Sequence, residues 1–302
     1  METEELTRRI ESLKKERRAI ILAHNYQRPE IQDIADYLGD SLELSRIAAE
    51  TDAEVLVFCG VQFMAETAAI LSPEKTVLLP VKEAGCPLAD MATPEQIRKA
   101  RKKYPQAAVV SYVNTSAEAK AESDACCTSG NAIEVVNSIE NDQVIFVPDM
   151  NLGRYVALHT DKEIILWQGW CPTHMALQAT DLAKYPLERE EVKFMAHPEC
   201  LPEVLELADR VAGTAGILSY VPHSVGHEFI VGTEMGLVHR LEKEYPGRKF
   251  YPPTEYLICP TMKMTTLQHV LEALKKMQHV IRIEEEVRIR ARRALDAMLA
   301  AT

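Results

Sequence analysis

Three of the seven cysteines in this 302-residue chain stand directly before a proline, at Cys86, Cys171 and Cys259. They lie 85 and 88 residues apart, and each is followed by a segment that contains methionine and threonine. This regular spacing predicts three repeated units that each carry one cysteine. If the three units pack around a common centre, their three cysteine side chains could come together at one site. Three soft thiolate ligands suit an iron–sulfur cluster or zinc. A cubane held by three cysteines keeps one iron open to act as a Lewis acid.

The remaining cysteines do not recur in register, so we assign them to structure and not to metal binding. They are Cys59, Cys126, Cys127 and Cys200. The sequence has no CxxC pair of the kind that forms a zinc ribbon. Disulfides are not expected either, because the cysteine count is odd and a reducing compartment keeps thiols free.

A set of polar triplets shares the register of the cysteines. The first strand of each unit is expected to end at His24-Asn25-Tyr26, Tyr112-Val113-Asn114 and His197-Pro198-Glu199. Histidine, glutamate and tyrosine can transfer protons in a dry cavity, where their pKa values move toward neutrality. A hydrogen-bonded histidine in the core is the plainer alternative for any single member, but the shared register favours a common site. Asp149 and Glu234, which follow third strands, are weaker candidates for the same site.

A hydroxyl follows the first member of each triplet by 17 residues, at Ser41, Ser129 and Thr214. Helices are expected to begin at these places. Each hydroxyl therefore suits either the capping of a helix or the binding of an anion at a helix N-terminus. Three of them around one cavity would form a cradle for a substrate with several anionic groups.

Short β-branched runs alternate with helical patterns along the whole chain, which is typical of parallel sheets built from βαβ units. The runs cover residues 19–25, 54–60, 76–80, 108–114, 143–149, 163–167, 192–198 and 228–232. We predict an α/β protein of three homologous three-layer αβα units with short parallel sheets. The units are expected at 1–86, 87–171 and 172–261, with the helices of 262–302 packed on the first unit. A pseudo-threefold arrangement would aim the carboxyl ends of the strands at one central active site.

The composition argues against two classes of partner. A net charge of −11 is unsuited to a nucleic-acid backbone, which would be repelled. The sequence has no apolar run of membrane-spanning length, and its first residues lack the apolar centre of a signal peptide. We therefore expect a cytoplasmic protein that binds neither nucleic acid nor a membrane.

Longer motifs around these residues resemble those of the quinolinate synthases, over nearly the whole chain. They include IILAHNYQRPEIQDIADYLGDSLELSR, FCGVQFMAETAAIL, YVNTSAEAKAESDACCTSGNAIEVV, GWCPTHM, AHPEC and VGTEMGLVHRL. The resemblance implies an enzyme of NAD biosynthesis that condenses iminoaspartate with dihydroxyacetone phosphate to quinolinate, phosphate and water. It also implies a central [4Fe-4S] cluster with Cys86, Cys171 and Cys259 as its ligands.

The resemblance implies residue roles in the same way. Substrate contacts are expected from His24, Ser41, Tyr112, Asn114, Ser129, His197, Glu199 and Thr214. We assign proton transfer to Tyr26, Glu199 and His197. A transient contact with an enzyme that supplies the unstable iminoaspartate is also expected.

The chain departs from many relatives at two places. A single cysteine, Cys259, stands where many relatives carry CxxCxxC, which removes a local disulfide switch. Gly213 stands where a serine is usual, which puts one hydroxyl contact to a substrate carboxylate in doubt.

Two other functions stay open from the sequence. One is a zinc-dependent hydrolase that uses the same three thiolates and a metal-bound water. The other is a non-catalytic protein in which three α/β units enclose an anionic metabolite. A dinucleotide-binding enzyme is disfavoured, because no G-x-G-x-x-G or P-loop follows any expected strand.

Overall fold

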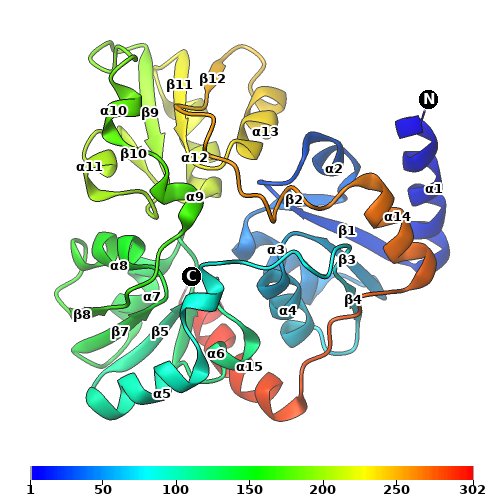
Figure 1. Cartoon of the computed structure of the whole chain (residues 1–302), viewed down its shortest axis with the longest axis horizontal. Coiled ribbons are helices and arrows are strands. Elements are labelled where there is room, and N and C mark those ends of the chain that lie inside the picture. Colours follow the sequence, from blue (N-terminus) through cyan, green and yellow to red (C-terminus); the bar gives the residue numbers. More distant parts are fainter. Residues whose placement is uncertain (1, 302) are drawn as a thin grey trace.

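The computed structural model describes residues 2–301 and contains three four-stranded sheets in which every pairing is parallel. Each sheet is flanked by helices, and the three sheets lie around a common centre (Figure 1). The predicted α/β fold of three αβα units is therefore confirmed. We name the sheets, in chain order and with their helices, units 1, 2 and 3, and we keep residues 86 and 171 as the proposed unit boundaries.

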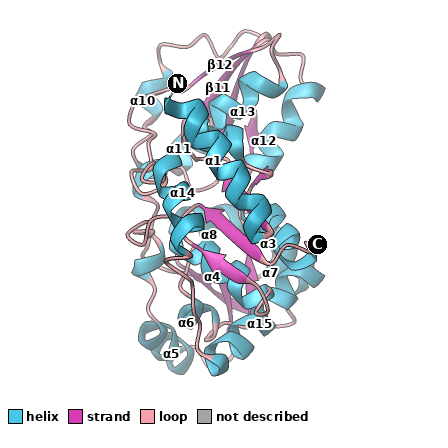
Figure 2. Cartoon of the chain, turned by 90° about the vertical axis from the view of Figure 1, so that its right-hand side faces the viewer, coloured by secondary structure: helices cyan, strands magenta, loops and turns pink. Residues whose placement is uncertain are grey.

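Unit 1 consists of the first four strands and their helices. The strands are β1 (Ala19–His24), β2 (Tyr37–Gly39), β3 (Val55–Cys59) and β4 (Thr76–Leu78), in the order β2-β1-β3-β4. The helices are α1 (Glu2–Arg17), α2 (Pro29–Ile34), α3 (Ser41–Glu50), α4 (Gln62–Leu71) and, from near the end of the chain, α14 (Leu267–Lys276). Helix α14 lies beside α1 over this sheet (Figure 2). Leu56 and Phe58 of β3 face the central core while Val55 and Val57 face the layer of α14, so both sheet faces are covered.

Unit 2 repeats this plan with strands β5 (Ala108–Tyr112), β6 (Ala125–Cys127), β7 (Gln143–Val147) and β8 (Glu163–Leu166), in the order β6-β5-β7-β8. Its helices are α5 (Pro94–Lys103), α6 (Ala117–Lys120), α7 (Ala132–Ser138) and α8 (Met150–Ala157), and the 3₁₀ turn η1 (Ala89–Met91) leads into them. Thr93 begins α5 with a capping box, and Pro94 occupies the first turn, where its missing N–H has no intrahelical partner to lose.

Unit 3 has strands β9 (Val192–Ala196), β10 (Arg210–Val211), β11 (Glu228–Gly232) and β12 (Lys249–Tyr251), in the order β10-β9-β11-β12. Its helices are α9 (Pro172–Met175), α10 (Ala179–Leu182), α11 (Pro202–Leu205), α12 (Thr214–Tyr220) and α13 (Gly236–Glu244), with the 3₁₀ turn η2 (Val221–His223) after α12. All three sheets have the same strand order, as expected for the three repeated units that the cysteine spacing predicts.

Each unit holds its second strand by the same pair of hydrogen bonds. An aspartate directly before that strand donates its backbone N–H to one residue of the first strand and accepts that residue's N–H with its carboxylate. The pairs are Asp36 with Ile21, Asp124 with Val109 and Asp209 with Phe194, with carboxylate distances of 2.7, 2.7 and 2.8 Å. These bonds set the register of a two- or three-residue edge strand whose side chains alone could not specify it.

The last helix, α15 (Glu285–Ala300), packs on β6 and α6 of unit 2 and also on α4 of unit 1. We predicted that 262–302 packs on the first unit: α14 does so, whereas α15 contacts both that unit and unit 2. The reason is the apolar face of α15, where Ala291, Ala294, Leu295 and Met298 are fully buried in the central core. A helix that bridges two units fixes one against the other.

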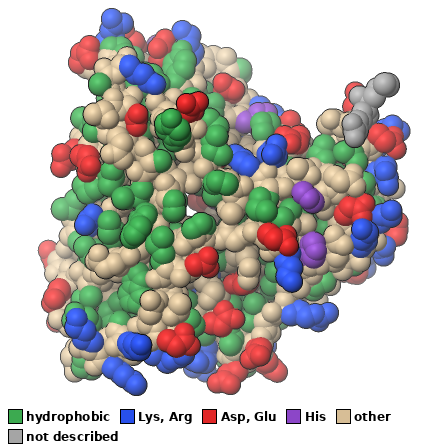
Figure 3. Space-filling model, in the orientation of Figure 1, with side chains coloured by type: hydrophobic (Ala, Val, Ile, Leu, Met, Phe, Trp, Pro, Cys, Tyr) green, Lys and Arg blue, Asp and Glu red, His purple; other side chains and the backbone are tan. Residues whose placement is uncertain are grey.

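Charged side chains of both signs are distributed around the surface, and the face seen in Figure 3 is hollowed near its middle, where the three units meet. Within residues 2–301, no helix is both long enough and apolar enough to cross a membrane.

Replacing Leu295 by alanine should lower the free energy of unfolding by about 2–5 kcal/mol, because it removes buried methyl groups and leaves a cavity between units 1 and 2. Leu158→Ala is the matched control, since Leu158 is 81% exposed and its loss should change that free energy by less than about 0.5 kcal/mol. Denaturant titration of both variants measures the difference. Equal stabilities would show that α15 does not join the units.

Candidate active site

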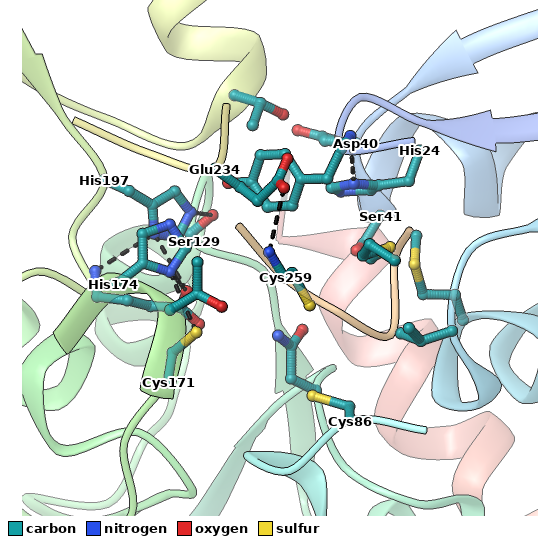
Figure 4. A pocket seen from close by; sticks show the side chains of 18 of the residues that line it. His24, Asp40, Ser41, Cys86, Ser129, Cys171, His174, His197, Glu234 and Cys259 are labelled. Carbon is teal, nitrogen blue, oxygen red and sulfur yellow. Dashed lines mark hydrogen bonds and ion pairs between the residues drawn. The ribbon is translucent and has the colours of Figure 1, made fainter. Parts of the chain in front are cut away.

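One cavity lies at the centre of the three units and is lined by residues from all of them (Figure 4). The residues predicted to bind metal, to contact substrate or to transfer protons are all among its lining residues: His24, Tyr26, Ser41, Cys86, Tyr112, Asn114, Ser129, Cys171, His197, Glu199, Thr214 and Cys259. Of the two weaker candidates, Glu234 also lines the cavity, whereas Asp149 is buried and is not among the lining residues. The space inside the cavity that the centre of a water molecule can reach is about 70 Å³.

The strand ends and helix starts place these side chains as the parallel topology requires. His24 and Tyr112 are the last residues of β1 and β5, and His197 directly follows β9. Ser41 and Thr214 are the first residues of α3 and α12. All of them therefore lie at the edge of a sheet that faces the centre.

The hydroxyls do not cap their helices, so the capping alternative is wrong. The N-cap of α3 is Asp40, whose carboxylate accepts the backbone N–H of Leu42 and Glu43 at 2.9 Å each. The N-caps of α7 and α12 are Asn131 and Gly213. The three hydroxyls line the cavity without capping a helix, and Thr214 Oγ1 accepts a hydrogen bond from Asn25 Nδ2 at 2.8 Å.

Gly213 stands close to one of these hydroxyls. A Cβ atom at residue 213 would lie 2.7 Å from Ser129 Oγ, nearer than such atoms approach one another. The Ser129 hydroxyl thus lies against residue 213, and it donates to or accepts from His197 Nε2 at 3.1 Å.

A continuous hydrogen-bonded chain runs from Tyr26 to Glu199. Tyr26 Oη lies 2.6 Å from Thr233 Oγ1, and His174 Nε2 lies 2.8 Å from the same hydroxyl. The other ring nitrogen, His174 Nδ1, lies 2.7 Å from Glu199 Oε2. All four side chains are buried. A proton can therefore pass between a tyrosine and a carboxylate that come from units 1 and 3.

Sequence reasoning missed two members of this chain. His174 is three residues after Cys171, on α9, in the motif GWCPTHM. Thr233 directly follows β11, the third strand of unit 3. The available signal for His174 was its helical spacing of one turn from a predicted metal ligand.

Glu199 is bound by a second histidine and a tyrosine. His197 Nδ1 lies 3.4 Å from Glu199 Oε2, and its ring stacks on that of His174 with 4.5 Å between centroids. Tyr112 also acts to lower the pKa of Glu199. Burial acts to raise the pKa of Glu199, but His174 and His197 outweigh it and hold that pKa below its ordinary value. The carboxylate is therefore ionised, while its Oε1 atom has no hydrogen-bond partner within residues 2–301.

Burial sets the protonation of the other polar side chains. It raises the pKa of Tyr26 and of Tyr112 well above the ordinary value, so both keep their hydroxyl protons. Burial and then the Lys263 ammonium lower the pKa of His24 to about 3, and burial and then His174 lower that of His197 to about 3. The cavity thus offers neutral donors together with two buried acidic side chains, Glu199 and Glu234.

The three Cys-Pro cysteines direct their side chains into the same cavity (Figure 4). Burial raises the pKa of Cys86 to about 12 and that of Cys171 well above its ordinary value, so their thiolates need a positive partner. Backbone hydrogen bonds of Ala89 and Leu88 act in the opposite direction and lower the pKa of Cys86. Three thiols from three units around one space fit a metal cluster by number, type and placement.

A second group of metal-type donors overlaps this set. Cys171, His174 and Glu199 each offer one atom, and these atoms lie within 4.8 Å of one another. They could hold zinc, although His174 Nδ1 and Glu199 Oε2 already bond each other. By contrast, Cys59, Cys126, Cys127 and Cys200 are fully buried among apolar side chains.

The low pKa of His24 predicts a pH dependence of stability. Between about pH 3 and 6.5 the unfolded chain binds a proton at His24 that the folded chain excludes, so the free energy of unfolding falls as the pH falls through that window. In metal-free protein, the loss between about pH 7 and about pH 5 should be smaller in His24→Gln than in the parent by roughly 2 kcal/mol. Denaturant titrations at the two pH values measure it. His223→Gln, at an exposed histidine, is the control, and an equal loss in His24→Gln and the parent would contradict a neutral His24.

Comparison with known proteins agrees with this geometry. The model of the family described as "Quinolinate synthetase A protein" matches residues 8–300. Quinolinate synthase 1 of Methanosarcina acetivorans is 55% identical over 300 residues, which cover 99% of both chains. The quinolinate synthases of Geobacter sp. (strain M21) and Dehalococcoides mccartyi are each 52% identical, over 99% and 100% of both chains. The chain therefore belongs to the quinolinate synthase family, whose members are enzymes of NAD biosynthesis.

Proposed function

We propose that this chain condenses iminoaspartate with dihydroxyacetone phosphate to quinolinate in the central cavity, with release of phosphate and water. The observation that carries the proposal is the unpartnered Glu199 Oε1, at the end of the hydrogen-bonded chain from Tyr26. A buried carboxylate oxygen without a donor is costly, so a substrate that brings a proton to it is favoured. Acid, base and three thiols are thereby combined in one cavity.

The three thiols would hold a [4Fe-4S] cluster. When bound, such a cluster supplies an open iron that polarises a substrate oxygen during dehydration. The placement of three cysteines from three units around one cavity supports the assignment. The backbone hydrogen bonds of Ala89 and Leu88 to Cys86 would also favour its thiolate form.

The substrates are anionic, and the cavity offers hydrogen bonds to hold them in place of surface cations. No lysine or arginine is among the lining residues that the structure describes. Neutral groups can bind carboxylates and phosphate through N–H and O–H donors in a site that excludes water. Ser41, Ser129 and Thr214, together with Tyr112 and Asn114, provide such groups from all three units and would orient the two substrates for reaction.

Proton transfer would use the chain from Tyr26 to Glu199. The Tyr26 hydroxyl keeps its proton and can give it to a departing oxygen. Thr233 can then pass a proton between His174 and Tyr26, since each adjacent pair lies within 2.8 Å. Glu199 Oε1 is placed to accept a proton from carbon or nitrogen, with His197 beside it.

Cys171→Ala should lose most of the bound iron and sulfide and the visible absorbance of the cluster, because two thiolates remain for a site that needs three. Purification and metal analysis under anaerobic conditions measure both. Cys59→Ala is the matched control, since Cys59 is buried in the core of unit 1 and its loss should leave the iron content unchanged. A full complement of iron in Cys171→Ala would rule out the three-cysteine site, and zinc at one atom per chain would favour the hydrolase.

Tyr26→Phe should lower turnover by about a hundredfold or more, the usual size of a lost proton-transfer step, with cluster content unchanged. Tyr245→Phe also removes one hydroxyl hydrogen bond, to the Leu218 carbonyl at 3.1 Å, but outside the cavity lining. That variant should keep the parental rate. Steady-state assays of quinolinate formation compare the two, and a near-parental rate in Tyr26→Phe would remove Tyr26 from the mechanism.

A further inference from the structure

Each cysteine loop is tied to its own unit by the same backbone hydrogen bond. The third residue after the end of the third strand donates its N–H to the carbonyl two residues before the cysteine. The bonds run from Gln62 to Ala84, from Met150 to Gly169 and from Met235 to Leu257, at 2.8, 2.8 and 2.9 Å. The threefold repeat thus extends to the way in which each loop is held.

Units 2 and 3 add a carboxylate to this tie. Asp149 Oδ2 accepts the backbone N–H of Cys171 at 3.0 Å, and Glu234 Oε1 accepts that of Cys259 at 3.1 Å. Both acidic residues are fully buried, and both stand two residues after the third strand of their unit. In each case a buried acidic side chain holds the main chain of a predicted metal ligand.

Unit 1 lacks this second bond. Val61 occupies the equivalent place, two residues after β3, and its side chain has no hydrogen-bond acceptor. The loop of Cys86 is therefore held to the end of β3 by the backbone bond between Gln62 and Ala84, without a carboxylate.

Each carboxylate is itself fixed through its other oxygen. Asp149 Oδ1 accepts the N–H groups of Asn151 and Leu152 at 2.9 and 2.8 Å and so caps α8. Glu234 Oε2 accepts the N–H of Gly236 at 2.7 Å, and the Lys263 ammonium lies 2.9 Å away. A side chain fixed at one oxygen holds the cysteine rigidly with the other.

Placing an acidic side chain in the core next to cysteine ligands has an electrostatic cost. An acidic residue at such a place therefore needs a structural reason. Asparagine would cap α8 as well as aspartate does. It offers a single acceptor oxygen, however, whereas Asp149 uses one oxygen for the helix and one for Cys171. The second acceptor is thus the property that an amide cannot supply.

We propose that Asp149 and Glu234 are positioning residues that hold Cys171 and Cys259 in the geometry needed to bind metal, and that Cys86 is the ligand on the more adjustable loop. The inference rests on the proposed ligation of a cluster by these three cysteines. Groups that orient metal ligands commonly change metal affinity by about 10–100-fold when they are removed. Two rigid ligands and one adjustable ligand would allow the cluster to enter before the site closes on it.

Asp149→Asn tests this directly, because the amide can keep its oxygen on α8 while its NH₂ group faces the N–H of Cys171. Iron loss from the anaerobically purified holoenzyme to a chelator should be about 10–100-fold faster than in the parent. Glu234→Gln should act in the same way through Cys259 and gives an independent reading if the first variant folds poorly. The melting temperature of each metal-free variant is measured as well. An unchanged melting temperature shows that faster iron loss reflects the lost hydrogen bond to the cysteine and not a loss of folding.

Asp124→Asn is the matched control, since it makes the same change from carboxylate to amide at a residue that accepts a backbone N–H at the opposite end of the unit 2 sheet. Its iron should be retained as in the parent. If Asp149→Asn and Glu234→Gln also retain iron while Cys171→Ala loses it, the positioning role of Asp149 and Glu234 is contradicted and the ligand assignment stands. If Cys171→Ala itself retains its iron, the ligand assignment fails and this inference fails with it.

Discussion

In a parallel sheet every strand delivers its last residue to the same edge, and in this chain three such edges face one centre (Figure 1). Each unit secures that geometry at both ends of its sheet. An aspartate before the second strand sets the register, and a backbone bond from the start of the next helix holds the cysteine loop. The positions of the thiols, hydroxyls and proton-transfer groups all depend on these repeated contacts.

The charge distribution inside the cavity follows from the same convergence. Dense packing of three units excludes water, which keeps Tyr26 and Tyr112 protonated and His24 neutral. Glu199 stays ionised because two histidines and Tyr112 surround it. An acidic protein can therefore bind anionic substrates through directed hydrogen bonds, and its negative surface need not present a basic patch.

Much of the fold could be predicted from the sequence, since each of the eight β-branched runs contains an observed strand. The edge strands β2, β6, β10 and β12 were not predicted, because a run of two or three residues shows no hydrophobic periodicity. Backbone pairing with the neighbouring strand stabilises them instead. The cavity-lining residues found from the sequence were those that recur in all three units. His174 was not predicted, because the equivalent positions of the other two units hold Ala89 and Met262. A residue that does not recur in the repeat cannot be identified from the repeat. The bridging position of α15 depends on tertiary packing, which its own amphipathic pattern does not specify.

The most direct test of the central claim is the iron and acid-labile sulfide content of the unmodified enzyme, purified without oxygen, together with its absorption spectrum. Convergence of three cysteines on one cubane predicts about four iron and four sulfide per chain, with a broad visible band that chelator removes. One zinc per chain without sulfide, or a protein free of metal, would contradict it.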